Sequence, residues 1–444
     1  MNPNFGVYYQ SADGARELLA YDPSVECSQP VPVMARKPVP LRGSLVDFSK
    51  SCGKFYVQNV YAGPGLNGVP RETIKTLRVV AVEYRPMYLH TGHMHCPCDK
   101  QYEQFIPYVG DMSGEAVTAG GAWDIKHVLG EVDVAPDGSC AFEVPANNSV
   151  YFQLLDERGR CVQTMRSWTM VMPGETIGCV GCHDSKPQVG DAGQAAAFGS
   201  VQRLRPIAGQ PPHPLLARLE RGGLLASADN YLGVNARRSC DPDAPMEGFS
   251  YIRMIQPILN THCVKCHDGG AKAAARLNLA AEEFPDFRQG AGRRFSKSYA
   301  ALTAGGRQTA MLNWYSATGR SAMLPPYAMG STQSKIMEYL EPSHYGVQVS
   351  DGEKRLFACW IDLSIPFGGS YAEATTWSPE DRRIVEYHQD KRQIFACQEV
   401  NTLRAQLNMR PVSLGRLQSG VFSPVSMIGE MTSDHRVSRT GEAW

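Results

Sequence analysis

Two pentapeptides in this sequence place cysteine and histidine at the spacing that attaches haem covalently to proteins. Their cysteines and histidines are Cys179, Cys182, His183, Cys263, Cys266 and His267. Two thiols three positions apart on one turn can bond the two vinyl groups of a haem, and the histidine that follows then lies beside the iron. From this composition we expect about 0.01 C-x-x-C-H matches by chance, so the repetition is informative. The motifs predict two covalently attached haem c groups.

Two other chemistries use C-x-x-C pairs. A zinc ribbon places its two pairs about 15–20 residues apart, whereas Cys182 and Cys263 are about 80 residues apart. A thioredoxin-like redox pair needs a βαβ setting, and the Pro-Gly-Glu and Asp-Gly-Gly segments beside the two motifs do not suggest one. We therefore favour haem over zinc at both motifs.

A third cluster concentrates metal-ligating side chains between the positions 90 and 98. It contains His90, His93, His95, Cys96 and Cys98. Gly92 and Pro97 predict a loop here rather than a helix face, and imidazole with thiolate suits Zn²⁺ or a redox metal. The alternative is a polar loop that lines a haem pocket. Zinc is thus a candidate additional cofactor.

The ligand on the far side of each iron decides between electron transfer and chemistry, because an open iron position can bind a small molecule. For the second haem we favour His344 in the segment Pro-Ser-His-Tyr. Met323 and Met329, which flank a Pro-rich loop, are the alternatives, since methionine there could equally be packing.

The first haem has no obvious distal ligand in the sequence. His213, His127, the histidines of the cluster at 90–98 and several tyrosines remain candidates, and an open iron is the remaining option. A lone histidine is more often a satisfied polar side chain than a ligand, and this applies to His127, His388 and His435.

Composition excludes several classes of protein. Lys plus Arg and Asp plus Glu both total 44 in 444 residues, so the formal net charge is zero and nucleic acid is not an expected partner. No apolar stretch approaches the roughly 20 residues that span a bilayer. Thirteen cysteines, an odd number, do not form one closed disulfide framework.

The surrounding pattern predicts an α+β protein, with a β-sandwich-like middle domain followed by a mainly helical cytochrome c-like domain. Short β-branched runs separated by turns, from residue 73 to 172, favour a sandwich that ends at the first motif. Apolar residues at helical spacing over 251–262 lead into the second motif. We expect a hairpin and linker over 1–45, a β-rich haem domain over 46–248, a helical domain over 249–410 and a flexible tail over 411–444.

Several phrases resemble the hydrazine synthase alpha-subunit family over about residues 5–400. They lie at Gly6–Gly14, at Met165–Trp168, at Ile255–Leu259 before the second motif, and at Ala358–Leu363. The resemblance implies that the N-terminal hairpin is the last blade segment of a propeller, followed by a middle domain with one haem c and a cytochrome-like domain whose haem has two histidine ligands. Because the propeller is almost wholly missing, we expect this chain to be a fragment or a truncated gene product.

The resemblance also implies export, since haem c is attached outside the cytoplasm, and hence a periplasmic or other extracytoplasmic location. It implies a redox partner protein and a hetero-oligomer. In hydrazine synthase a tyrosine is the proximal ligand of the middle-domain haem while the motif histidine binds zinc; here Pro187 stands four positions after His183, with no tyrosine close behind. We expect an exported dihaem protein whose second haem serves electron transfer. Its first haem either continues the relay or acts on a small nitrogen or oxygen substrate, and a zinc-stabilised interaction module without haem is the alternative.

Overall fold

The protein was analysed as a computed structural model, which divides into two compact units, residues Met1–Ser44 and Leu45–Trp444. The structure describes residues 6–22, 27, 30–31, 43–83, 125–182, 195–236, 247–268, 270, 277–285, 294–303, 311–314, 323–374 and 379–414. The second unit carries the described residues of both C-x-x-C-H motifs.

The first unit contains one antiparallel hairpin, β1 (Val7–Gln10) and β2 (Arg16–Ala20). Its turn is closed by hydrogen bonds between Ser11 and Ala15, and Gly14 adopts a φ of 90°, which a residue without Cβ tolerates. The Tyr-rich pattern predicts a hairpin at this place.

The second unit begins with a three-stranded sheet. Its central strand, β3 (Cys52–Val57), pairs antiparallel with β6 (Cys140–Pro145) and parallel with β9 (Thr176–Cys179). The parallel pair places Cys179 opposite Val57 at the end of the sheet. The first motif therefore begins at the last residue of a paired strand, which fixes its first thiol against the sheet.

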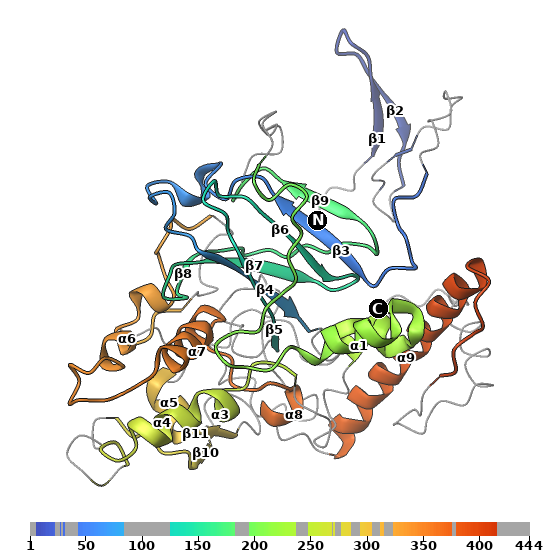
Figure 1. The fold of residues 1–444 in the computed structure, drawn as a ribbon. Coiled ribbons are helices and arrows are strands. Elements are labelled where there is room, and N and C mark those ends of the chain that lie inside the picture. Colours follow the sequence, from blue (N-terminus) through green and yellow to red (C-terminus); the bar gives the residue numbers. More distant parts are fainter. Residues whose placement is uncertain are drawn as a thin grey trace. The chain divides into compact units, whose positions relative to one another are not determined.

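A four-stranded antiparallel sheet has the order β5-β4-β7-β8 (Figure 1). Its strands are β5 (Lys126–Asp133), β4 (Thr76–Val82), β7 (Val150–Leu155) and β8 (Cys161–Thr164). The central strand, β4, is rich in β-branched residues, which favour a pleated and buried position.

Aromatic rings join the two sheets. The ring of Phe152 on β7 lies 5.0 Å from that of Phe55 on β3 and 5.4 Å from that of Phe142 on β6, in both cases edge to face. Such pairs add roughly 0.5–1.5 kcal/mol beyond the area they bury. The two sheets thus share one apolar core.

The four-stranded sheet is buried on both faces, as the pattern of β4 shows. Leu77, Val79 and Ala81 belong to the core between the sheets, whereas Val80 belongs to a second core that contains the helices. Neighbouring residues of a strand point to opposite faces, so this one strand connects both cores.

The helical part packs around large buried rings. It includes α3 (Tyr251–Met254), α4 (Gln256–His262), α5 (Lys297–Thr303), α6 (Ile336–Tyr339), α7 (Asp351–Asp362), α8 (Tyr371–Ala374) and the small hairpin of β10 (Glu283–Pro285) and β11 (Arg294–Ser296). Trp360 is fully buried, and its ring lies 5.0 Å from that of Tyr251. Its indole nitrogen donates to the carbonyl of Pro366.

Three further helices pack on the sheet core. They are α1 (Pro214–Gly222), α2 (Ala228–Leu232) and the long α9 (Pro379–Gln406). Val400 of α9 is buried in the core between the sheets, and Arg404 donates to the carbonyl of Leu225. The C-terminal helix therefore returns to the β-rich part of the chain.

The mixture of sheets and helices confirms the α+β class expected from the sequence. One element differs. The pattern over 251–262 predicts one helix, but the structure has α3 and α4, separated at Ile255. Pro257 is the second residue of α4, and a proline donates no backbone hydrogen bond and so interrupts the pattern of the first helix.

Candidate functional site

The second motif forms one turn at the end of α4. Cys263 follows the helix directly, and the backbone nitrogens of Cys266 and His267 each donate to its carbonyl at 3.1 Å. The turn brings both thiols and the imidazole to one end of the helix. Burial, aided by the nearby Cys266, raises the pKa of Cys263 to about 11.

The ring of His267 is oriented by a backbone carbonyl. Its Nδ1 lies 3.1 Å from the oxygen of Leu277. A carbonyl only accepts, so Nδ1 carries the proton and the lone pair of Nε2 is left for a metal ion. Metal-bound histidines commonly hold their second nitrogen in this way.

His344 faces His267 from a different segment. The ring centroids are 6.5 Å apart, and the ring planes differ by 19°. His344 lies after α6 in a turn closed by its own nitrogen on the carbonyl of Glu341 at 2.9 Å, and the ring of Tyr339 packs 5.1 Å away. Two segments about 70 residues apart in the sequence thus present nearly parallel imidazoles.

The spacing of these two rings fits one metal ion between them. An imidazole nitrogen lies about 2 Å from a bound ion, so two rings on opposite sides of one ion have centroids roughly 6 Å apart. The observed 6.5 Å matches this separation. Together with the two thiols of the adjoining turn, the residues present fit a haem c with two histidine ligands.

A partly buried contact between two side chains joins α4 to α7. Nε2 of His262, the last residue of α4, lies 3.1 Å from a carboxylate oxygen of Glu353. Glu353 also completes a capping box with Ser350 at the start of α7. Burial raises the pKa of Glu353, but hydrogen bonds from Ser350 and His262 outweigh it, and the net pKa is lowered. The helix that ends on the motif is thereby anchored to the helix next to it.

The first motif is held by the loop after β3. Asn59 donates to the carbonyl of Val180 at 3.0 Å, and Cys182 donates to the carbonyl of Val60 at 3.3 Å. A Cβ on Gly181 would lie 2.2 Å from the carbonyl oxygen of Ala62, so only glycine fits this position. His183 lies outside the described residues.

A cavity of about 480 Å³ opens beside the first motif. Both of its cysteines, Cys179 and Cys182, line the cavity together with Gly181. The remaining wall is formed by Phe55, Val57, Val60, Leu77, Phe152, Leu154, Gln163, Thr164, Met165, Arg166, Ser167, Thr169, Met323 and Leu324. Sites for small molecules and cofactors commonly have this size and a mostly apolar wall with few polar groups. The cavity suits an apolar macrocycle tethered through the two thiols.

No histidine or tyrosine is present among the described residues that line this cavity. Its sulfur-bearing side chains, apart from the motif, are Met165 and Met323. Met323 is an alternative ligand for the second haem in the sequence, but here it lines the first cavity. Met329, the other alternative, packs against the helical core.

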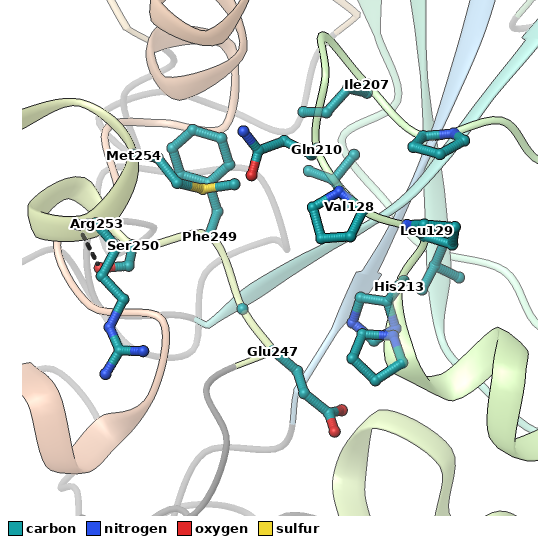
Figure 2. A pocket seen from close by; sticks show the side chains of 15 residues that line it. Val128, Leu129, Ile207, Gln210, His213, Glu247, Phe249, Ser250, Arg253 and Met254 are labelled. Carbon is teal, nitrogen blue, oxygen red and sulfur yellow. Dashed lines mark hydrogen bonds between the residues drawn. The ribbon is translucent and has the colours of Figure 1, made fainter. Parts of the chain in front are cut away.

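His127 and His213, both candidates for the first haem, do not line its cavity. They are buried and contact each other, with Nδ1 of His127 3.1 Å from Nε2 of His213. Glu83 contacts the far side of His127, and Glu247 lies close by. Glu83 and Glu247 have no motif-like spacing to these histidines, so the sequence contains no signal for this group. It borders a second cavity, shown in Figure 2.

The remaining cluster at 90–98 lies outside the described residues, with His90, His93, His95, Cys96 and Cys98. His388, on α9, is half-buried, and burial, aided by Lys391, lowers its pKa. His435 also lies outside the described part of the chain. Among the described helices, none is long and apolar enough to cross a membrane.

Comparison with known proteins adds a family assignment for part of the chain. Residues 72–184 match the family described as the hydrazine synthase alpha subunit middle domain. This segment contains β4 to β9 and the first motif. A search of curated proteins found no match.

Among solved structures, a chain of Kuenenia stuttgartiensis hydrazine synthase is similar at 17% sequence identity with a TM-score of 0.42. The match covers 75% of this chain and 45% of the hydrazine synthase chain. This chain therefore spans less than half the length of the solved relative. Residues 72–184 are therefore similar to the middle domain of hydrazine synthase alpha subunits.

Proposed function

We propose that this chain is an exported c-type haem protein that carries two covalently attached haem groups and acts in electron transfer. Cys263, Cys266 and His267 would hold one group, with His344 as its second axial ligand. Cys179, Cys182 and His183 would hold the other. A haem between two imidazoles supplies one-electron transfer, and a haem with an open iron position binds small molecules.

The observation that carries this proposal is the facing pair of His267 and His344. Their ring centroids have the separation that one ion between the rings requires. The carbonyl of Leu277 holds the proton of His267 on Nδ1, so Nε2 needs no rearrangement before it binds. These residues would close both axial positions and keep other ligands away, as suits a carrier of electrons.

The first cavity favours a second candidate function, catalysis on a small nitrogen or oxygen substrate. Its described wall offers thioethers from Met165 and Met323 but no imidazole or phenol. The polar side chains in the wall of this largely apolar cavity belong to Gln163, Thr164, Arg166, Ser167 and Thr169. Gln163 donates to the carbonyls of Gly65 and Leu324, both at 2.8 Å, and Thr164 donates to the carbonyl of Met165 at 3.2 Å.

The finer organisation belongs to the same proposal. We place a hairpin and linker at 1–45, a sandwich-like haem domain at 46–248, a helical cytochrome-like domain at 249–410 and a tail at 411–444. The relation to hydrazine synthase alpha middle domains supports haem c and an oxidoreductase role. Covalent haem attachment implies an extracytoplasmic location, a redox partner protein and, by analogy with the family, a hetero-oligomer. Zinc on the cluster at 90–98 stays a prediction.

The test is the covalent haem count and the ligand-binding spectrum of the full chain, expressed with a secretion signal and the haem-maturation machinery. We expect two haems per chain that denaturation does not extract. Reduced protein exposed to carbon monoxide should then show whether each iron is accessible.

Binding of carbon monoxide to only one haem in the wild type, and to a second haem once His344 is removed, would favour a catalytic first haem. Two haems without a carbon monoxide response favour a carrier. Absence of covalent haem from protein matured in parallel with an authentic c-type cytochrome would overturn the proposal and favour a zinc-stabilised interaction module.

A further inference from the structure

We propose that His127, His213 and Glu247 form a binding site for a divalent transition metal ion, with Zn²⁺ as the preferred ion, separate from both C-x-x-C-H motifs. The potential ligand atoms of these three residues lie within 4.8 Å of one another. Two imidazoles with one carboxylate are a ligand set that binds zinc and leaves a further coordination position for water or substrate.

The two imidazole nitrogens are separated by nearly the distance expected between two nitrogens that bind one ion. Nδ1 of His127 and Nε2 of His213 are 3.1 Å apart. Two nitrogens bound about 2.0–2.1 Å from one tetrahedral ion are roughly 3.3 Å apart. The ring planes are inclined to each other at 76°.

Glu83 fixes His127 in the tautomer that a metal ion needs at Nδ1. Its carboxylate lies 3.0 Å from Nε2 of His127, and both side chains are almost fully buried. A carboxylate accepts, so Nε2 carries the proton and Nδ1, which faces His213, presents its lone pair. A carboxylate behind a metal-bound histidine fixes its tautomer and makes the ligand more basic.

Glu247 supplies the independent indication of a missing cation. Its side chain is 7% exposed, and Arg218 contacts one carboxylate oxygen, Oε1, at 2.8 Å. The other oxygen, Oε2, is buried and has no hydrogen-bond partner in the described part of the chain. A buried acceptor without a partner costs about 1–3 kcal/mol, more when it is charged. A metal ion beside the two histidines would satisfy this oxygen.

One hydrogen bond of His213 competes with metal binding and must be given up when the ion binds. Nδ1 of His213 accepts a hydrogen bond from the backbone nitrogen of Leu215 at 3.3 Å and so caps α1. When Nε2 binds the ion, its proton has to move to Nδ1, and the cap is lost. The exchange gives up one neutral hydrogen bond of 3.3 Å for a bond to the ion.

The fourth position of the ion would face a cavity. His213 and Glu247 both line a pocket of about 240 Å³, which Phe249, Met254 and Gln210 also border (Figure 2). Figure 2 shows Glu247 and His213 close together on one side of this pocket. A water molecule or a small ligand has space there to complete the coordination.

The test compares zinc content and affinity in the haem-loaded full chain and in matched variants. His213→Asn removes the ligand but keeps a residue that caps helices well. Glu247→Gln keeps the shape and an oxygen for Arg218 but removes the charge. His388→Asn, on α9, controls for loss of a histidine elsewhere. Each protein is equilibrated with Zn²⁺ at a buffered free concentration and then analysed for zinc and haem.

We expect His213→Asn and Glu247→Gln to bind one equivalent of zinc fewer than the wild type and His388→Asn, with the same haem content in all four. Glu83→Gln should weaken zinc binding about 10–100-fold, as expected for loss of a carboxylate that orients a metal ligand. Equal zinc in the wild type and both ligand variants would overturn the proposal. Because the haem count is read from the same samples, failure of the haem proposal would be seen separately.

A second measurement does not depend on folding of the variants. Wild-type protein loaded with Zn²⁺ should melt at a higher temperature than the same protein after a chelator has removed the ion. The zinc-edge absorption spectrum of the wild type should contain a nitrogen and oxygen shell with imidazole scattering. A shell of sulfur alone would assign the ion to cysteines and contradict the site.

Discussion

His267 and His344 face each other with nearly parallel rings whose centroids are 6.5 Å apart. One ring belongs to the turn that follows α4 and the other to the loop that follows α6, so two segments of the helical part meet at this place. The pair is the structural basis for the assignment of the second haem as a carrier of electrons.

Replacement of His344 by alanine should open one axial position of the second haem without removing the haem, because Cys263, Cys266 and His267 still hold it. We expect the reduced variant to gain one carbon monoxide-binding haem per chain relative to the wild type. Tyr345→Ala is the control, since this neighbour is 98% exposed. An unchanged carbon monoxide spectrum in His344→Ala would assign the ligand elsewhere.

Replacement of His344 by methionine should raise the reduction potential of the second haem, because a thioether ligand favours the reduced iron more than imidazole does. Redox titration of the wild type and the variant, monitored by absorbance, measures the shift. The potential of the other haem should stay where it was. A lowered potential would argue against His344 as ligand.

Single cysteine replacements should affect one haem each. Cys182→Ala and Cys266→Ala each leave one thioether at their own motif, so we expect a shifted absorbance maximum and weaker retention for that haem alone. Mass spectrometry of the denatured chain counts the covalent groups. Cys27→Ser, in the N-terminal unit, is the control and should retain both. A full, unshifted complement of haem in Cys182→Ala would disprove the first assignment.

Gly181→Ala should disturb the first motif. The added Cβ would meet the carbonyl oxygen of Ala62 at 2.2 Å, whereas a Cβ on Gly178, three residues earlier, meets nothing within 4 Å. Overpacking of this kind costs about 1–3 kcal/mol. We expect reduced haem attachment at the first motif and a lower melting temperature for Gly181→Ala, with Gly178→Ala close to the wild type. Equal behaviour of the two variants would contradict the described packing.

The buried Asp362 should make stability depend on pH. Burial raises its pKa to about 6 from 3.8, although donors from Ser331 and Cys161 and the charge of Arg78 act in the other direction. Between about pH 4 and 6 the folded protein therefore holds a proton that the unfolded chain has lost. The contribution of this carboxyl to stability falls as pH rises through that window.

The comparison of the wild type with Asp362→Asn isolates the pH-dependent contribution of Asp362 to stability. Asparagine does not titrate, so the loss of stability on replacement should be larger at pH 4.5 than at pH 7, by about 2 kcal/mol. Urea unfolding of both proteins at the two pH values measures the difference in the free energy of unfolding. Asp351→Asn, whose side chain is 98% exposed, serves as control. The same loss at both pH values would show that Asp362 does not titrate in this range.

The two C-x-x-C-H motifs can be found in the sequence, because five consecutive residues contain the thiols and the imidazole. The hairpin, the strands and the α+β class follow from local patterns for the same reason: neighbours along the chain decide whether a short segment forms a strand, a turn or a helix. The apolar spacing over 251–262 predicts an uninterrupted helix, whereas the structure interrupts it at Ile255. Pro257 is the residue in the sequence that indicates this interruption.

The tertiary structure alone brings together residues that no spacing connects. It places His344 opposite His267, lines the first cavity with Met323, and brings His127, His213 and Glu247 together, with Glu83 behind His127. A contact between distant residues depends on how strands pair and which faces are buried together. β4 illustrates this, since its alternate residues pack into two different cores and so connect the β-rich and helical parts of the chain.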